Sequence, residues 1–263
     1  RALVNNEREL ENTVLLLTRH FDRQFEDSDT IAADVISRLQ IPGIASEREF
    51  RERITSPEAH EILRSKAGVL SYLGDISIFD SNGDMMNWSG HLPAPALNIS
   101  ARGYFRTFKF DPRSASVLSE PVRGYISGNI YTVVAHRLRG EDGMFLGVMT
   151  RRIDPATYEK FFASVALGTG ATISMFHSDG TMLARYPQDK ALIGQNFAKA
   201  PLLQRVRDRG GPQTLRLQSP VDQSDKLGAA APLAHFPGVV IATNAVSDAL
   251  ADWREQNRFL VIA

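Results

Sequence analysis

Apolar residues recur at helical spacing through the first forty residues of the chain. The apolar positions of this stripe lie three, four or seven residues apart and are Leu10, Val14, Leu17, Phe21, Phe25, Ala32, Val35 and Leu39. Glutamate, arginine and aspartate occupy much of the remaining surface, so the pattern predicts one long amphipathic helix. We expect its apolar stripe to pack along the body of the protein, with pairing to a second copy as a second possibility.

A second helix is predicted to begin near Ser56. The hydroxyl of Ser56 can cap a helix, Pro57 suits a first turn, and Glu58 is favoured at the positive end of the helix dipole. The part of the chain up to about residue 69 is therefore expected to be helical.

From about Asp75 the pattern changes to that of strands, and it contains a repeat. Residues 76–85 read as an apolar strand, an Asn-Gly turn and the start of a returning strand, which is the pattern of a β-hairpin. Residues 173–182 repeat this pattern, and six of the ten aligned positions are identical. The identical positions form the pattern Ile-Ser-x-Phe-x-Ser-x-Gly-x-Met. More residues are shared than a turn alone requires, which indicates an internal duplication.

Each hairpin is followed by a helical or looped stretch and then by further strands. The later strands are predicted at residues 130–135, 144–149, 214–217, 227–230 and 239–242, with a turn at 140–143 and a connecting helix from Asp154. This order predicts two α+β units in which helices lie on an antiparallel sheet.

Composition narrows the classes of function. Thirty lysines and arginines balance thirty aspartates and glutamates, which argues against a nucleic-acid partner. There is no cysteine and hence no disulfide or thiolate site. No apolar run approaches the roughly 20 residues that span a bilayer. Because the chain begins inside a helical pattern and an apolar run starts at Phe259, we expect it to lie between two membrane spans of a longer protein.

Enzyme and metal patterns are weak. Asp80, Asn82 and Asp84 imitate the start of a calcium loop, but His91 stands where that loop needs a glutamate, so a hairpin turn explains them better. The histidines are scattered, and there is no Gly-x-Ser-x-Gly elbow or phosphate loop. We therefore expect no enzymatic activity, no cofactor and no metal in this chain.

Several motifs along the chain carry a family resemblance. They are Ser-Ala-Arg-Gly-Tyr-Phe-Arg at 100–106, Ser-Glu-Pro-Val-Arg-Gly at 119–124, Ser-Gly-Asn at 127–129, Leu-Gly-Val at 146–148 and Ile-Asp-Pro at 153–155. With the long helix and the repeated hairpin, they resemble the double Cache family, the tandem PAS-like sensor domains of bacterial histidine kinases, diguanylate cyclases and chemoreceptors. The resemblance implies an α+β fold: a long N-terminal helix followed by two tandem PAS-like units, each an antiparallel sheet flanked by helices.

The resemblance also implies domain boundaries. They are 1–69 for the long helix and helical linker, 70–155 for a membrane-distal, ligand-binding unit, 156–247 for a membrane-proximal unit, and 248–263 for a C-terminal helix leading to a transmembrane segment.

Family members that bind amino acids hold the ligand carboxylate with an Arg-x-Trp-Tyr stretch. Arg102, Tyr104 and Phe105 match this stretch, with tyrosine in place of tryptophan. The family holds the amino group with a Tyr-x-Asp and a final aspartate, whereas this chain has Val122 and Gly124 at the first two places and an arginine at the third.

The departures change the expected ligand. A buried ammonium needs carboxylate partners, so an α-amino acid is disfavoured. Two guanidinium groups, from Arg102 and Arg152, instead suit a carboxylate or phosphate bound in bidentate fashion. We therefore expect a small anionic ligand.

Six residues are candidates for ligand contact, and each has a structural alternative. They are Arg102, Tyr104, Phe105, Arg106, Tyr131 and Arg152. The arginines can instead form surface ion pairs or lie at the rim, and the aromatic residues can belong to the core.

The sequence thus predicts a periplasmic sensor domain of a bacterial inner-membrane histidine kinase or diguanylate cyclase, anchored through flanking segments. Ligand binding is expected to act by helix displacement. The first helix is also the expected surface for pairing if two copies form a homodimer. The alternatives are a chemoreceptor sensor domain and an interaction or structural domain without a small-molecule ligand. A pocket lined by Arg102 and Tyr104 favours the sensor, and one closed by Tyr104, Phe105 and Tyr131 favours the last alternative.

Overall fold

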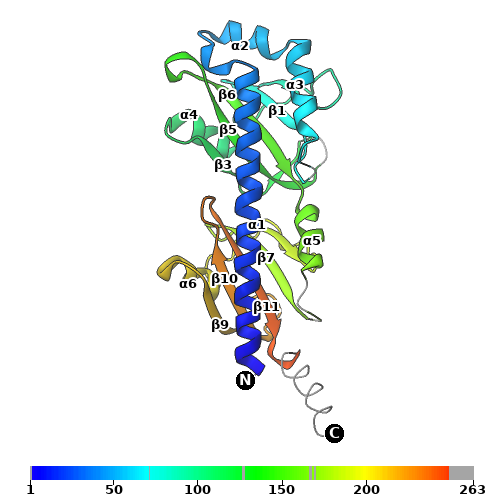
Figure 1. The fold of residues 1–263 in the computed structure, drawn as a ribbon, viewed down its shortest axis with the longest axis vertical. Helices are drawn as coiled ribbons and strands as arrows, with labels where there is room; N and C mark the ends of the chain where they lie inside the picture. The colour runs from blue at the N-terminus through cyan, green and yellow to red at the C-terminus, as the bar shows by residue number, and fades with distance from the viewer. Residues whose placement is uncertain (1, 71, 126–127, 166–167, 169, 249–263) are drawn as a thin grey trace. The chain divides into compact units, whose positions relative to one another are not determined.

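Helix α1 (Ala2–Arg38) is the long helix that the apolar stripe predicts (Figure 1). In the computed structural model, which describes residues 2–70, 72–125, 128–165, 168 and 170–248, all eight residues of the stripe are buried. Within these residues, no helix has both the length and the apolar character that a membrane span requires. The expected C-terminal helix at 248–263 lies outside the described residues, apart from Asp248.

The chain divides into two compact units. We call Gln24–Asp154 the first unit, and the second unit combines the start of the chain through Arg23 with the chain from Pro155 onward. Helix α1 therefore contributes residues to both cores.

The first unit is built on an antiparallel sheet. Its strands are β1 (Ile76–Asp80), β2 (Met85–Trp88), β3 (Ser116–Leu118), β4 (Val122–Arg123), β5 (Ile130–Arg139) and β6 (Phe145–Ile153), in the order β2-β1-β6-β5-β3, with β4 also paired to β5. Its other elements are the 3₁₀ helices η1 (Ile41–Gly43) and η2 (Glu141–Gly143) and the helices α2 (Glu47–Ile54), α3 (Pro57–Ala67) and α4 (Gly103–Phe110). Ser56 caps α3 as predicted, because its hydroxyl accepts the N–H of Ala59 at 3.1 Å.

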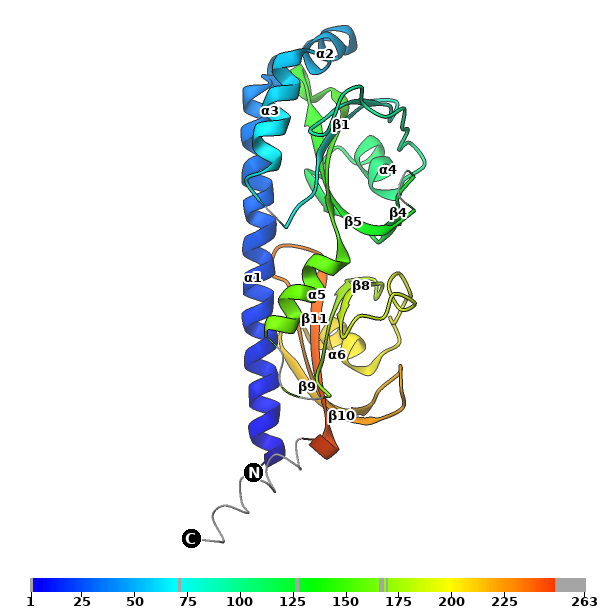
Figure 2. The same ribbon diagram turned by 90° about the vertical axis from the view of Figure 1, so that its right-hand side faces the viewer.

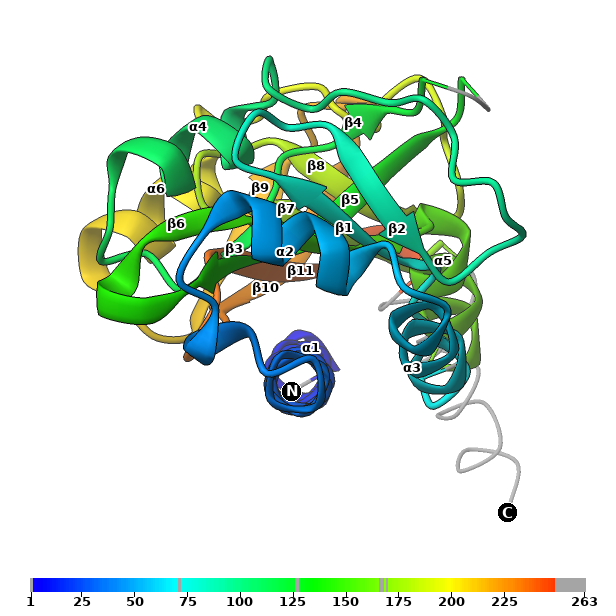
Figure 3. The same cartoon turned by 90° about the horizontal axis from the view of Figure 1, so that it is seen from above.

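Helices cover the two faces of this sheet differently (Figures 2 and 3). The last turns of α1, together with α2 and α3, pack against one face around Ile76 and Ile78. Helix α4 packs against the opposite face, around Phe79 and Val148. Successive strand residues point to opposite faces, so each strand serves both cores.

The second unit repeats this plan. Its strands are β7 (Thr172–His177), β8 (Met182–Tyr186), β9 (Gln213–Gln218), β10 (Asp225–Pro232) and β11 (Gly238–Ala245), in the antiparallel order β8-β7-β11-β10-β9. Its helices are α5 (Pro155–Ser164), α6 (Pro201–Arg209) and the beginning of α1. The predicted fold class, a long helix and two α+β units with antiparallel sheets, is confirmed.

Polar contacts attach α1 to each unit separately. In the first unit, Nε2 of His136 lies 2.7 Å from a carboxylate oxygen of Asp29. In the second unit, the carboxylate of Asp22 accepts the backbone N–H of Ala234 at 2.9 Å, and Glu7 accepts the hydroxyl of Thr214 at 2.5 Å. The helix is therefore a structural part of both units.

The duplicated hairpins share a turn that requires glycine. Gly83 and Gly180 have φ of +87° and +97°. A Cβ added to them would lie 2.7 Å from the backbone nitrogen of Ser100 and 2.5 Å from that of Ala198, respectively. A side chain at either position would be strained and would clash with backbone, which explains why the repeat keeps glycine at this place.

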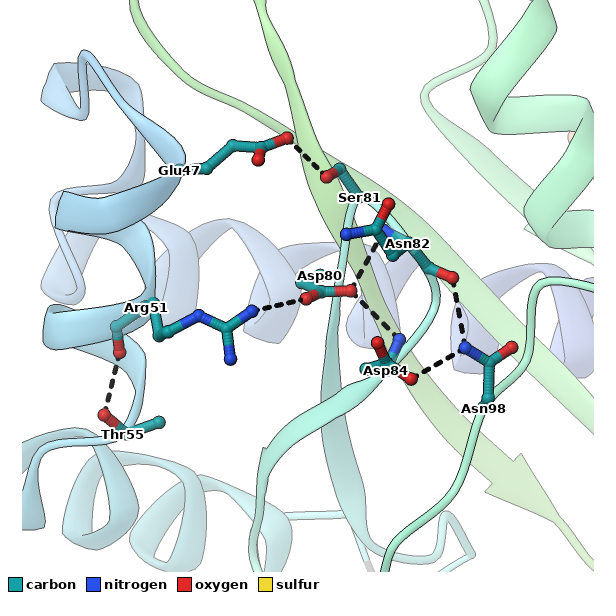
Figure 4. Close-up of polar contacts among 8 residues, drawn as sticks. All are labelled: Glu47, Arg51, Thr55, Asp80, Ser81, Asn82, Asp84 and Asn98. Atoms are coloured by element: carbon teal, nitrogen blue, oxygen red, sulfur yellow. Dashed lines mark hydrogen bonds and ion pairs between the residues drawn. The ribbon is translucent and has the colours of Figure 1, made fainter.

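Figure 4 shows how the acidic residues of the first turn are used. One carboxylate oxygen of Asp80 accepts the N–H groups of Asn82 and Asp84, at 2.9 and 3.0 Å, and the other accepts Arg51 at 3.1 Å. Asp84 accepts the side-chain amide of Asn98 at 2.7 Å. These contacts support the hairpin turn over a calcium loop, and no group of three or more possible metal ligands occurs within the described residues.

Candidate ligand-binding site

A cavity of about 70 Å³ lies on the α4 side of the sheet in the first unit. One water needs roughly 10–15 Å³ of such space, so a small molecule of several heavy atoms can fit. The apolar wall is formed by Phe79, Met85, Trp88, Pro95, Leu97, Ile99, Val122 and Val133. The polar side chains are those of Ser77, Arg102, Tyr104, Tyr125, Tyr131, Thr150 and Arg152.

Four of the six candidate residues meet at this cavity. Arg102, Tyr104, Tyr131 and Arg152 line it, although they come from the start of α4, from β5 and from β6. The remaining two, Phe105 and Arg106, do not line it.

Helical geometry separates Phe105 and Arg106 from the cavity. Consecutive helical residues point about 100° apart, so only part of the 102–106 motif can face one side. Phe105 is buried in the core, with its ring centroid 5.8 Å from that of Phe145, while Arg106 is exposed to solvent. Phe105 therefore lies in the core and Arg106 on the surface, which are the structural alternatives given above for these two residues.

Arg102 occupies the N-cap position of α4 and is held at the edge of the cavity. Its guanidinium donates to the carbonyl oxygen of Arg123 at 2.6 Å and lies 4.1 Å from the ring centroid of Tyr125. The backbone contact uses only part of its fork of five N–H donors. Donors therefore remain for a ligand.

Arg152 reaches the cavity from β6 and has a carboxylate partner. Its guanidinium forms an ion pair with Asp75, and its side chain is 43% exposed. It also lies 5.5 Å from the ring centroid of Tyr131, within the range of a cation–π contact. Asp75 is thus an acidic neighbour of the cavity that was not among the residues predicted from the sequence.

The polar lining of the cavity offers guanidinium and hydroxyl donors. Burial, opposed in part by the charge of Arg102, raises the pKa of Tyr104 above its ordinary value, so its phenol stays protonated and able to donate. Among the described residues that line the cavity, two are arginines and none is acidic. An oxyanion would find guanidinium and hydroxyl donors here.

Eleven further lining residues were not among the candidates, and three of them show what the sequence could and could not signal. Ser77 is identical to its counterpart in the repeat, which was an available signal, and Trp88 ends the same hairpin. Tyr125 follows the 119–124 motif, and no pattern in the sequence distinguishes it. A cavity lined by Arg102 and Tyr104 is present, which is the arrangement that favours the sensor over the structural alternative.

Comparisons with known proteins identify the class of this fold. The chain superposes on the extracellular domain of rpHK1S-Z16, a protein assigned as a histidine kinase, with TM-score 0.81 and 28% identity over 95% of this chain and 99% of that one. It also resembles the periplasmic sensory domain of the Campylobacter jejuni chemoreceptor Tlp1, with TM-score 0.71 and 11% identity over 95% and 98% of the chains. The ligand-binding domain of the Pseudomonas fluorescens chemoreceptor CtaA, in complex with L-isoleucine, gives TM-score 0.62 and 14% identity over 93% and 94%.

The comparison by sequence covers a shorter part of the chain than the comparison by structure. The family model described as dCache_1_like, histidine kinase sensor domain, matches residues 156–243. No curated protein matches the chain in sequence. The resemblance to double Cache sensor domains is thus confirmed: the chain has the fold of extracellular sensor domains of histidine kinases and chemoreceptors, and its second unit matches the histidine kinase sensor family. These are sensor and ligand-binding domains, not catalytic ones.

Proposed function

We propose that this chain is the periplasmic sensor domain of a bacterial inner-membrane receptor, a histidine kinase or diguanylate cyclase, and that its first unit binds a small carboxylate-bearing anion. The observation that carries this proposal is the cavity with two lining arginines and no lining acid among the described residues. A buried carboxylate would be costly without such donors and is stabilised by charge-assisted hydrogen bonds with them.

The cavity also limits the size and character of the ligand. Phe79, Trp88 and Ile99 provide apolar surface, while Arg102 and the Tyr104 hydroxyl provide donors on the α4 side. A short organic acid combines both requirements, because its alkyl part can lie on the apolar wall while its carboxylate meets the arginine.

An amino acid is the second candidate, and one observation favours it. Asp75 lies beside the cavity as the partner of Arg152, so an ammonium group has one carboxylate to approach. That carboxylate is already neutralised by a guanidinium, and drawing it away would leave Arg152 unpaired. We therefore favour the acid that lacks an amino group.

Signal relay is assigned to α1. The helix is attached to the first unit through Asp29 and to the second through Asp22. A ligand that binds one arrangement of the first unit more tightly than another shifts the population between them, and α1 would carry that shift towards flanking membrane segments. Pairing of two chains along α1 belongs to the same proposal, since Val4 on this helix is an apolar side chain that is 49% exposed.

A thermal-shift screen with two arginine variants tests the binding proposal. Organic acids are expected to raise the melting temperature of the wild-type chain by mass action. In Arg102→Ala the affinity should fall about tenfold or more, because a charge-assisted hydrogen bond contributes roughly 1.5–3 kcal/mol. Arg106→Ala is the matched control and should respond like wild type, since Arg106 lies outside the cavity.

The screen can also contradict the proposal. If Arg102→Ala keeps the full shift, the ligand does not use this arginine. If amino acids and amines give shifts and organic acids give none, the anionic ligand is excluded.

A further inference from the structure

The second unit has a cavity of its own, of about 60 Å³, at the place that corresponds to the first cavity. Three of its lining residues are the repeat counterparts of lining residues in the first unit. The pairs are Ser77 and Ser174, Phe79 and Phe176, and Met85 and Met182. The duplicated hairpin therefore places the same three side chains in a cavity in each unit.

The charge in this second cavity comes from two cations, Arg185 and Lys226. The side chain of Lys226 is only 6% exposed, although lysine is rarely buried without a partner. Arg185 donates to the hydroxyl of Ser174 at 3.2 Å, and burial is the largest cause that lowers its pKa. Both cations have thus lost much of their water.

Acidic side chains neutralise these two cations only in part. Nζ of Lys226 lies 3.4 Å from a carboxylate oxygen of Asp222, whose own side chain is 50% exposed and lies outside the cavity lining. Among the described residues that line this cavity, none is acidic. A buried ammonium and a partly desolvated guanidinium facing one small cavity favour an oxyanion there.

The remaining lining residues indicate the chemical character of the rest of the ligand. Leu202 and Ile241 belong to an apolar wall around the two cations. We propose that the second unit contains a separate site for a short aliphatic carboxylate, with the carboxylate on Arg185 and Lys226 and the alkyl group on this wall. The site does not depend on ligand binding in the first unit.

Propionate is a suitable probe, and Arg102→Ala is a suitable background because it disables the first cavity. Isothermal titration of Arg102→Ala with propionate should show binding that propionamide, the neutral analogue, and propylammonium, the cation, do not reproduce. Adding Lys226→Met keeps the apolar stem but removes the charge, and it should weaken propionate binding about tenfold or more. Circular dichroism melts establish that each variant is folded.

A second variant keeps the test decisive if Lys226→Met does not fold. Asp222→Asn changes a half-exposed side chain and removes the competing carboxylate from Lys226, so propionate should bind more tightly to it. The proposal is overturned if Arg102→Ala does not bind propionate, if propionamide binds equally well, or if neither Lys226→Met nor Asp222→Asn changes the affinity. The first cavity could still bind its ligand in all three cases, so the two proposals fail separately.

Discussion

Replacing Phe21 by alanine should strongly destabilise the second unit, because this side chain fixes the beginning of α1 to the unit. Phe21 is fully buried. Its ring lies edge-on to those of Tyr158, Phe161 and Phe162, with centroid distances of 5.1, 5.8 and 5.7 Å. All three partners lie on α5, so this cluster joins two helices that are far apart in sequence.

The magnitude follows from these contacts. Truncating a buried phenylalanine to alanine costs about 3–5 kcal/mol. Each edge-to-face contact contributes about 0.5–1.5 kcal/mol beyond its buried area, so Phe21→Ala belongs in the upper part of that range. Helix propensity does not add to the loss, because alanine is the best helix former.

Leu16→Ala is the control on the same helix. Leu16 is 63% exposed, and its truncation should change the free energy of unfolding by no more than about 0.5 kcal/mol. Urea unfolding followed by circular dichroism measures both variants, and hydrogen exchange in β7 and β11 localises the loss. A cost below about 1 kcal/mol for Phe21→Ala, close to that of Leu16→Ala, would refute the docking of α1 on this unit.

Two further predictions concern the second unit. Gly180→Ala should lower the free energy of unfolding in urea by about 1–3 kcal/mol, since its positive φ and its approach to Ala198 both disfavour a side chain. Gly103→Ala is the control and should leave that free energy unchanged, because the space around Gly103 is open. Equal losses in the two variants would contradict this reasoning. For Asp222, the hydrogen bond from Ser224 is the largest cause that holds the pKa well below its usual range. A depressed folded-state pKa contributes stability that is present above about pH 4 and is lost as pH falls towards the folded value. Asp222→Asn should therefore be less stable than wild type at neutral pH and lose less stability on acidification. Urea titrations across pH measure both proteins, and equal acid sensitivity would exclude a stabilising role for the Asp222 carboxylate.

The long helix and the duplicated units were predictable because they rest on patterns repeated over many residues. Every apolar position of the α1 stripe is buried, and the repeat at 76–85 and 173–182 forms hairpins with matching turns. Periodicity and repetition report on which faces are buried, and burial determines these elements.

The candidate site was only partly predictable, because a linear motif does not specify directions in space. The 102–106 motif begins a helix, so Tyr104 faces the cavity while Phe105 enters the core and Arg106 points to solvent. The second cavity had no family motif to indicate it, and its two cations, Arg185 and Lys226, are 41 residues apart in sequence.

Two neighbouring arginines on β6 show the same limit. Strand alternation places Arg152 on the cavity face and therefore Arg151 on the opposite face. Arg151 is almost fully buried there and donates to the carbonyl oxygen of Ala67, the last residue of α3, at 2.9 Å. Burial lowers its pKa to about 10. The sequence singled out only the arginine that lines the cavity, because nothing local indicates that its neighbour closes a helix end.

Matched pairs of ligands can establish whether the first cavity selects a carboxylate without an amino group. Isothermal titration of Lys226→Met, in which the second cavity is disabled, should compare succinate with L-aspartate and propionate with L-alanine, which differ only by the ammonium group. We expect at least one of the two acids to bind more tightly than its amino-acid partner, and we expect Arg102→Ala to remove this binding. Tighter binding of the amino acid in both pairs would rule out selection against an amino group and would assign Asp75 as the partner of its ammonium.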